Sequence, residues 1–369
     1  ALMDPKKLSS RRGRAALCWA GVTLVAVQAI LAITIELSPA VRDPEFGAKL
    51  SRLKEQLAAR PEAPLLLVLG SSRSASGIRP ADILAGGSSD APLVFNLALT
   101  GYGPIQQLQL LDRLRQAGIS PRWILAEIHP LLLHQEPGVW GEEQWMRPDS
   151  LDRHDLAVVG GYLSQPRQWL RQWARLRLAP AFCYRFQLLN WLSPGWLDTS
   201  LRQDGAWREL DPCGWLPLVC ETDRESTERR REEAQRQYAP ALGDFRITAT
   251  ADRALREFVE VARRRGIRLG FYLMPEGEVF RSWYTPEARG QIELYLRRFE
   301  REERVPVFDA TTWCCDADFS DSHHLLSHAS PGFSRRFGEE IVRPFLALSP
   351  VTGPVGDELA RPPGASGRR

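Results

Sequence analysis

The residues best suited to chemistry stand near opposite ends of the chain. Near the beginning, the aliphatic run from Leu65 to Leu69 is followed directly by Gly70-Ser71-Ser72-Arg73. A short continuous apolar run is typical of a buried parallel strand, and ligands in open α/β sheets bind beyond the carboxyl ends of such strands. A glycine turn there would aim the hydroxyl of Ser72 out of the sheet. The same residues also suit an ordinary surface turn, because glycine and serine are common turn formers.

The second group of reactive residues is Asp321-Ser322-His323-His324-Leu325, in a loop that precedes the last helical stretch. A serine hydroxyl becomes a nucleophile only when a base takes its proton and a third group orients that base. Asp321 and His324 offer a base and an orienting carboxylate from one short segment. We therefore expect Ser72, His324 and Asp321 to meet at one edge of the sheet as a catalytic triad.

The same histidines allow a metal-binding interpretation. His324 and His328 are four residues apart, and Asp321 and His323 would add further ligands, so a helical arrangement would suit zinc. The segment Ser-His-Ala-Ser-Pro at 327–331 is poor helix sequence, however, and no glutamate lies between the two histidines. We therefore expect neither a metal ion nor another cofactor.

Strands and helices alternate in the regions that must position these groups. Apolar runs predict strands at 65–69, 93–97, 123–128, 268–274 and 305–309, and helical spacing predicts helices at 46–60, 81–84, 105–117, 248–265, 287–302 and 331–346. Pro306 favours an edge position for the last strand. This alternation predicts an α/β fold, a three-layer sandwich with a central parallel, doubly wound sheet, over residues 44–347.

The alternation is lost between about 137 and 245, and we interpret this region as a helical insertion or cap over the sheet. It contains eight of the twelve tryptophans: Trp140, Trp145, Trp169, Trp173, Trp191, Trp196, Trp207 and Trp215. Aromatic rings at this density suit stacking on sugar rings, and they equally suit the core of a small helical subdomain. A charged, solvated helix is expected near 223–237.

The N-terminal region predicts a membrane anchor. Residues 1–14 are basic, and the following 21 residues, Ala15 to Ile35, include no charged side chain. A helix of that length spans about 30 Å, the thickness of the hydrocarbon core. The basic cluster should remain in the cytoplasm, with the main domain on the outer side of the membrane. The competing interpretation is a cleaved signal peptide, since Ser38-Pro39-Ala40 loosely resembles a cleavage site.

Composition excludes other classes of protein. The formal net charge is +3, and residues 1–14 alone contribute +4, so the remainder has no general basic surface that would bind nucleic acid. The six cysteines include Cys213 and Cys220, a pair that an exported domain could oxidise, and no CxxC spacing is present. The proline- and glycine-rich tail at 350–369 is expected to be disordered.

Taken in order, these segments resemble the SGNH (GDSL-like) hydrolase superfamily. Gly70-Ser71-Ser72-Arg73 is similar to its first block, Asn96-Leu97-Ala98-Leu99-Thr100-Gly101 to its second, and Asp321-Ser322-His323-His324-Leu325 to its last. The resemblance covers about 62–130 and 246–347. It implies that Ser72 is the nucleophile, His324 the base and Asp321 its partner. It also implies that Gly101 and the amide of Ser72 bind the oxyanion.

One block departs from the superfamily pattern. The third block, GxND, would supply an Asn side chain to the oxyanion hole at the end of the third strand, where this chain has Glu127-Ile128-His129-Pro130. His129 is either a replacement donor or an ordinary loop histidine. Arg73 either binds an anionic substrate or pairs with a carboxylate. With these alternatives open, we place Gly101, Asn96, Arg73 and His129 in the oxyanion and substrate part of the site.

An N-terminal anchor together with the missing block is similar to the layout of membrane-tethered SGNH-like proteins. These act beside membrane-bound O-acyltransferases to acylate exopolysaccharides and teichoic acids. The resemblance implies a membrane-anchored, extracytoplasmic serine acyltransferase or esterase that acts on O-acyl groups, most simply acetyl, of a cell-surface polysaccharide. The alternative is a non-catalytic binding or assembly subunit of a polysaccharide modification or export system, with the tryptophan-rich region as its working surface.

Overall fold

The structure is a computed structural model of the chain. It describes residues 5–84, 91–134, 141–198, 202, 209–220, 223–243 and 245–348, with side chains from Gly13 onward. The tail predicted to be disordered (350–369), the first residues of the basic segment, and two of the eight tryptophans of the insertion, Trp140 and Trp207, lie outside the described residues.

The central sheet has five parallel strands in the order β2-β1-β3-β4-β5. Their bounds are β1 Leu65–Leu69, β2 Leu93–Asn96, β3 Trp123–Glu127, β4 Arg268–Leu273 and β5 Val307–Asp309. The prediction of an α/β fold with a parallel sheet is therefore confirmed. So is the edge position of β5, which directly follows Pro306. Because the chain runs the same way in every strand, the loops after β1, β2 and β3 leave from one edge of the sheet.

Helices cover both faces of the sheet and make three layers. Alternate residues of β1 point to opposite sides: Leu65, Leu67 and Leu69 belong to one buried apolar cluster, and Leu66 and Val68 to the other. The first cluster includes residues of α3 Pro44–Ala59, α6 Pro104–Gln116, α13 Ala249–Arg264 and α15 Pro286–Glu303. The second includes residues of α5 Pro80–Ile83, α16 Ser330–Phe337, the π-helical turn Gly338–Val342 and α17 Arg343–Ala347.

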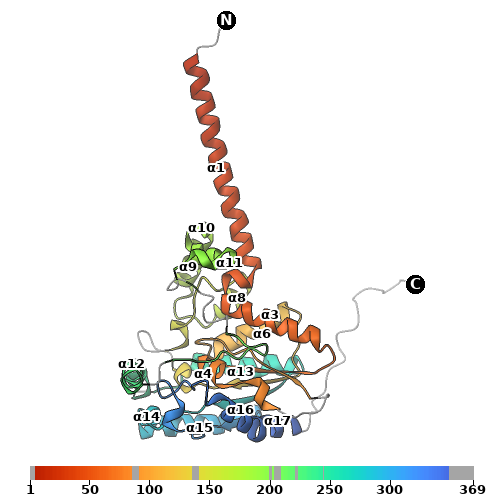
Figure 1. The fold of residues 1–369 in the computed structure, drawn as a ribbon, viewed down its shortest axis with the longest axis vertical. Helices are drawn as coiled ribbons and strands as arrows, with labels where there is room; N and C mark the ends of the chain where they lie inside the picture. The colour runs from red at the N-terminus through yellow and green to blue at the C-terminus, as the bar shows by residue number, and fades with distance from the viewer. Residues whose placement is uncertain are drawn as a thin grey trace, which may run out of the picture.

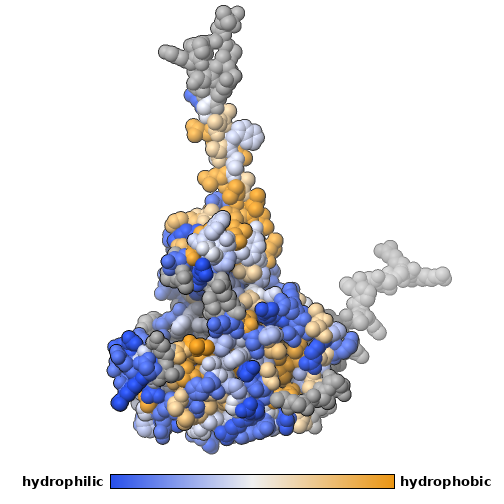
Figure 2. Space-filling model, viewed as in Figure 1, coloured by the Kyte–Doolittle hydropathy of each residue, from blue (hydrophilic) through white to orange (hydrophobic). Residues whose placement is uncertain are grey.

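The N-terminal helix α1, Pro5–Leu37, projects from this body as a long single rod (Figure 1). Its segment Gly13–Leu37 is 25 residues long and apolar enough to cross a membrane. Within the described residues it is the one helix with that length and composition. Its apolar side chains are exposed along most of the rod (Figure 2). The short helix α2, Pro39–Arg42, then turns the chain into α3.

The predicted insertion is a set of short helices. They are η1 Glu142–Gln144, α8 Arg153–Val159, α9 Pro166–Leu178, α10 Pro180–Cys183, α11 Arg185–Leu192 and η2 Pro194–Trp196, followed by the longer α12 Arg224–Gly243; α7 Pro130–Leu133 precedes the insertion. The middle three, α9, α10 and α11, gather around the base of α1 (Figure 1). No residue of α9 is buried, so the tryptophans of this helix do not form the core of a separate subdomain.

The six cysteines all lie within the described residues, and all six are free thiols. Cys213 and Cys220, the pair that the sequence left open to oxidation, are therefore not joined. The main chain of Cys213 has a structural role instead, because its carbonyl accepts a hydrogen bond from the amide of Asn96 at 2.9 Å.

Candidate active site

Ser72 is the first residue of the short helix α4, Ser72–Gly77, and is separated from the end of β1 by Gly70 and Ser71. Ser71 caps this helix, since its Oγ accepts a hydrogen bond from the amide of Arg73 at 3.3 Å. The turn is tightly packed: a Cβ at Gly70 would lie 2.5 Å from Ser74 Oγ and 2.6 Å from Glu127 Oε2. This packing explains the need for glycine between the strand and the serine.

Glu127, the last residue of β3, holds this turn in place. Its Oε2 accepts hydrogen bonds from the amide of Ser71 (2.8 Å), from Ser71 Oγ (2.9 Å) and from Ser74 Oγ (2.7 Å). The carboxyl group is buried, so these charge-assisted bonds are strong. From the sequence, Glu127 is apparent only as part of the block that lacks an asparagine. A charged residue at the end of an otherwise apolar strand was the signal for its role.

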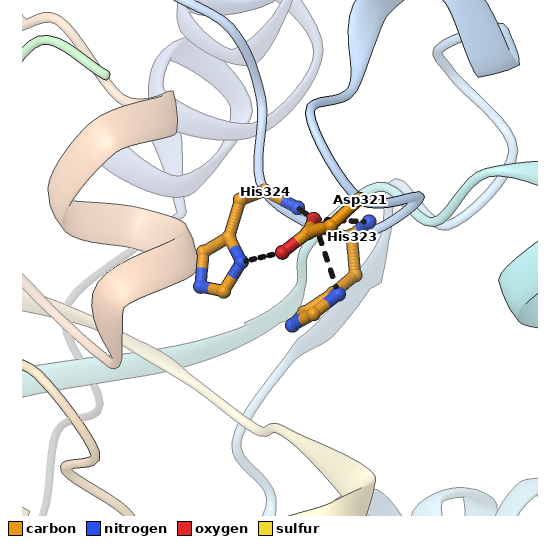
Figure 3. Close-up of side chains that lie close together, drawn as sticks. All are labelled: Asp321, His323 and His324. Atoms are coloured by element: carbon orange, nitrogen blue, oxygen red, sulfur yellow. Dashed lines mark hydrogen bonds and ion pairs between the residues drawn. The ribbon is translucent and has the colours of Figure 1, made fainter. Parts of the chain in front are cut away.

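The second part of the site is the loop of Asp321, His323 and His324 (Figure 3). An isolated antiparallel bridge between Phe319 and Leu325 closes this loop at its base. Asp321 Oδ1 accepts hydrogen bonds from the amides of His323 (3.2 Å) and His324 (2.8 Å). Ser322 is fully buried and has a φ of 78°, a conformation that costs energy for a residue with a side chain. This strained residue allows one turn to present Asp321 and His324 together.

The structure brings Ser72, His324 and Asp321 into one hydrogen-bonded chain. Ser72 Oγ lies 2.8 Å from His324 Nε2, and His324 Nδ1 lies 2.7 Å from Asp321 Oδ2. Burial opposes ionisation of Asp321, but the neighbouring histidines and their hydrogen bonds outweigh it and hold its pKa well below the usual range. An ionised Asp321 fixes Nδ1 of His324 as the protonated nitrogen, which leaves Nε2 as an acceptor for the serine proton.

The metal-binding interpretation has less support from the geometry. Asp321, His323 and His324 have potential ligand atoms within 4.8 Å of one another. Both ring nitrogens of His324, however, are already paired with Asp321 and Ser72. His328 is exposed in a turn, and α16 begins only at Ser330, so His324 and His328 do not lie on one helix. The residues present fit a hydrogen-bonded triad better than a metal site.

Asn96 is the last residue of β2, and Gly101 lies in the loop that follows it. Gly101 has a φ of 76°, and a Cβ there would lie 2.5 Å from the Cβ of Trp145. The Nδ2 group of Asn96 donates to the carbonyls of Ser74 (2.8 Å) and Ile78 (2.7 Å), so its two protons are used. Asn96 therefore ties β2 to α4, and its prediction as an oxyanion or substrate residue is corrected to a structural role.

Two residues of α3 brace the loop that carries Gly101. Lys49 is fully buried, and its Nζ donates to the carbonyl oxygens of Ala98 (2.6 Å) and Asn96 (3.4 Å). Glu45 accepts hydrogen bonds from the amide and the hydroxyl of Thr100. Burial lowers the pKa of Lys49 to about 8, although Glu45 opposes that shift. No local pattern in the sequence marks this pair, because its partners lie about 50 residues along the chain and are mostly main-chain atoms.

Arg73 does not face a substrate. Its side chain is 1% exposed and lies between two carboxylates, with Nη1 3.3 Å from Glu276 Oε1 and Nε 3.9 Å from Glu127 Oε1. Its Nη2 also donates to the carbonyls of Met274 and Pro275. Of the two interpretations left open, pairing with carboxylates is therefore the one that holds, and the prediction of Arg73 as a substrate residue is corrected. The buried guanidinium therefore joins α4 to the end of β3 and to the loop after β4.

His129 and His323 are both buried close to the triad. Burial, with the charges of Arg73, His323 and His324, lowers the pKa of His129 well below its usual value. Burial likewise lowers the pKa of His323 to about 3. The ring of His323 stacks on Phe280 at 4.9 Å between centroids and meets the edge of Tyr238 at 4.8 Å. Both rings are therefore neutral at pH 7, and His324 is the histidine bonded to the serine.

Parts of the insertion pack against the segments that carry the site residues. Trp145 covers Gly101, and the indole N–H of Trp215 donates to the carbonyl of Ser76 on α4 at 2.6 Å. The amide of Ser327, which follows the triad histidine, donates to the carbonyl of Leu218. Residues 211–218 therefore run between α4 and the histidine loop. This part of the predicted insertion therefore contacts both segments that carry the triad residues.

Comparisons with known proteins give no independent assignment. No protein-family model matches the chain, and no curated protein matches it in sequence. The functional assignment consequently rests on the chemistry of the site and on the resemblance of the sequence blocks.

Proposed function

We propose that this protein is a membrane-anchored serine acyltransferase or esterase that acts outside the cytoplasm on O-acyl groups of a cell-surface polysaccharide. The observation that supports the proposal most directly is the hydrogen-bonded chain from Ser72 Oγ through His324 to Asp321, with distances of 2.8 and 2.7 Å. A serine placed after a buried strand, a histidine oriented by a carboxylate and a neighbouring glycine loop are what acyl transfer requires.

The proposed reaction has two halves. In the first, His324 Nε2 takes the proton of Ser72 while Oγ attacks the acyl carbonyl, and the leaving alcohol then receives that proton from His324. In the second, a sugar hydroxyl or water attacks the acyl-serine, with His324 as base, and Ser72 recovers its proton when it leaves. Hydrolysis and transfer differ only in the acceptor of the acyl group.

The oxyanion would be stabilised by amides at the end of β1 and β2. The amide of Ser72 lies in the first turn of α4, where backbone N–H groups lack partners within the helix. Gly101 supplies the second amide in this proposal, and the buried neutral imidazole of His129 replaces the asparagine of the missing block. Each such donor contributes about a hundredfold or more in rate.

Two further features support a polysaccharide substrate at a membrane. Trp145 lies against Gly101 and Trp215 against α4, and flat aromatic faces suit sugar rings. The rod α1 has the length and composition of a single-span anchor. A membrane-bound O-acyltransferase that delivers the acyl group is the partner that this arrangement would serve.

The proposal is tested by labelling the full chain in lipid nanodiscs with a fluorophosphonate probe, read by intact mass and peptide mapping. We expect one adduct, on Ser72 of the wild type, and none in Ser72→Ala or His324→Ala. Ser51→Ala, a change at an exposed serine of α3, is the matched control and should label fully. If neither purified protein nor native membranes are labelled at Ser72, the catalytic proposal fails and a binding or assembly subunit is the better description.

A further inference from the structure

The large exposed apolar side chains are concentrated in two adjoining places. One is α1, as expected of an anchor. Outside α1, nine large apolar side chains are exposed among the described residues, and six of them lie in the segment 166–197. Their exposed fractions range from 53% to 78%, and they are Leu170, Leu178, Phe182, Trp191, Leu192 and Trp196. A surface that stays in contact with water rarely has so many large exposed apolar side chains close together. The cluster therefore indicates a surface that another molecule or a membrane covers in the working protein.

This segment packs against the part of α1 that would lie inside the membrane. The amide of Ala181 donates to Gln28 Oε1 at 3.2 Å, and Arg177 pairs with Glu36, the first charged residue after the apolar stretch. Gln28 lies seven residues before Ile35, which is about 10 Å along a helix. The start of α10 is therefore about 10 Å deeper than the end of the apolar stretch, close to the depth that interfacial helices reach.

The charge and side-chain types of the segment agree with that depth. Residues 166–197 include five arginines and no acidic residue: Arg167, Arg171, Arg175, Arg177 and Arg185. The guanidinium of Arg185 lies over the rings of Phe182 and Phe186, at 4.5 and 4.3 Å from their centroids. Arginine side chains that pack along apolar groups can extend their guanidinium groups to lipid phosphates. Tryptophans favour the boundary between lipid and water. In Figure 2 the apolar colour of α1 continues beside blue side chains onto the adjoining body.

We propose that α9, α10 and α11 form a second membrane contact, in which they insert into the head-group region of the leaflet that faces the main domain. This inference rests on the proposed anchoring by α1. A single helix joined to a domain leaves the domain free to tilt, whereas a second contact beside it fixes the orientation of the domain. The active site would then be held in a constant position relative to the membrane surface, which suits exchange of acyl groups with a membrane-bound partner.

Photo-crosslinking to lipid tests the proposal on the full chain. A p-benzoyl-phenylalanine residue replaces Phe182 in α10, Leu24 in α1, or Leu294 in α15, in protein reconstituted into phosphatidylcholine–phosphatidylglycerol vesicles. Leu294 is the matched control because it is an equally exposed apolar residue (68%, as for Phe182) on a helix far from α1 (Figure 1). After irradiation, adducts are identified by intact mass, and thermal unfolding checks that each variant is folded.

We expect lipid adducts at positions 24 and 182 and none at position 294. Adducts at position 24 with none at position 182 would overturn the second contact and leave the anchor standing. A protein–protein crosslink at position 182 would also overturn it, in favour of a second copy of the chain. No adduct at position 24 would refute the anchor itself, and the inference would fail with it.

Discussion

Glu127→Gln is the substitution that examines the proposed site most directly, because it changes one atom and leaves the shape of the side chain intact. The carboxylate of Glu127 receives three hydrogen bonds from the turn that carries the nucleophile and faces the guanidinium of Arg73. The variant amide offers one neutral acceptor to the turn. In one orientation of the side chain its NH2 group faces the three donors of the turn. In the other it faces the Arg73 guanidinium, where the partial positive charge of the NH2 group is unfavourable.

The expected loss follows from these contacts. Exchange of a charged for a neutral acceptor costs about 1 kcal/mol per hydrogen bond, so three bonds give about 3 kcal/mol. Loss of one carboxylate from Arg73 adds about 1 kcal/mol, since the buried guanidinium keeps Glu276 and two carbonyl partners. We expect a free energy of unfolding lower by about 4 kcal/mol and a midpoint lower by about 10 °C. Displacement of Ser72 should slow labelling about a hundredfold.

Thermal unfolding by tryptophan fluorescence and the rate of fluorophosphonate labelling measure the two effects separately. Glu276→Gln is the matched control, because the carboxylate of Glu276 contacts the side chains of Arg73 and Tyr284, whereas the three donors to Glu127 belong to Ser71 and Ser74. This control should be destabilised but should label at close to the wild-type rate. A Glu127→Gln protein with wild-type unfolding and wild-type labelling would show that the carboxylate does not hold the nucleophile turn.

Three other substitutions test neighbouring parts of the site. Gly101→Ala should destabilise the protein by about 3 kcal/mol and slow labelling, because the new Cβ would meet Trp145. Gly118→Ala, at an equally positive φ with open space around it, should cost only about 1 kcal/mol, and equal losses in the two variants would contradict the packing argument. Asp321→Asn should slow labelling about 10⁴-fold while Ser72 stays in place, because the amide favours the wrong tautomer of His324. An unchanged labelling rate would show that Asp321 is not part of the triad. Because the pKa of His323 is lowered to about 3 in the folded protein, the unfolded chain binds its proton first, and the wild type loses stability as pH falls below about 6.5. Between pH 7 and pH 5, the free energy of unfolding of His323→Phe, measured by denaturant titration, should therefore fall by about 2 kcal/mol less than that of the wild type. Equal decreases in the two proteins would show that protonation of His323 does not destabilise the fold.

The sequence by itself determined the elements with strong local signals. The apolar run before Ser72 and the later runs became the five strands of a parallel sheet, and Pro306 marked the edge strand. The positions of Ser72 and His324 at strand and loop ends followed from the direction of the chain in such a sheet, which brings carboxyl ends to one edge. The long uncharged N-terminal stretch was also predictable, because the signal for a single long helix lies in consecutive residues.

Only the tertiary structure decided which polar groups pair and which surfaces adjoin. Asn96 and Arg73 looked like substrate residues by their positions, yet both are used up by buried partners that come from other strands and helices. Glu127 and Lys49 gained their roles in the same way, from donors and carbonyls 47 to 56 residues away in the chain. Burial makes every such pairing necessary, but the partner is chosen by the packing of the whole fold, and no local pattern records it.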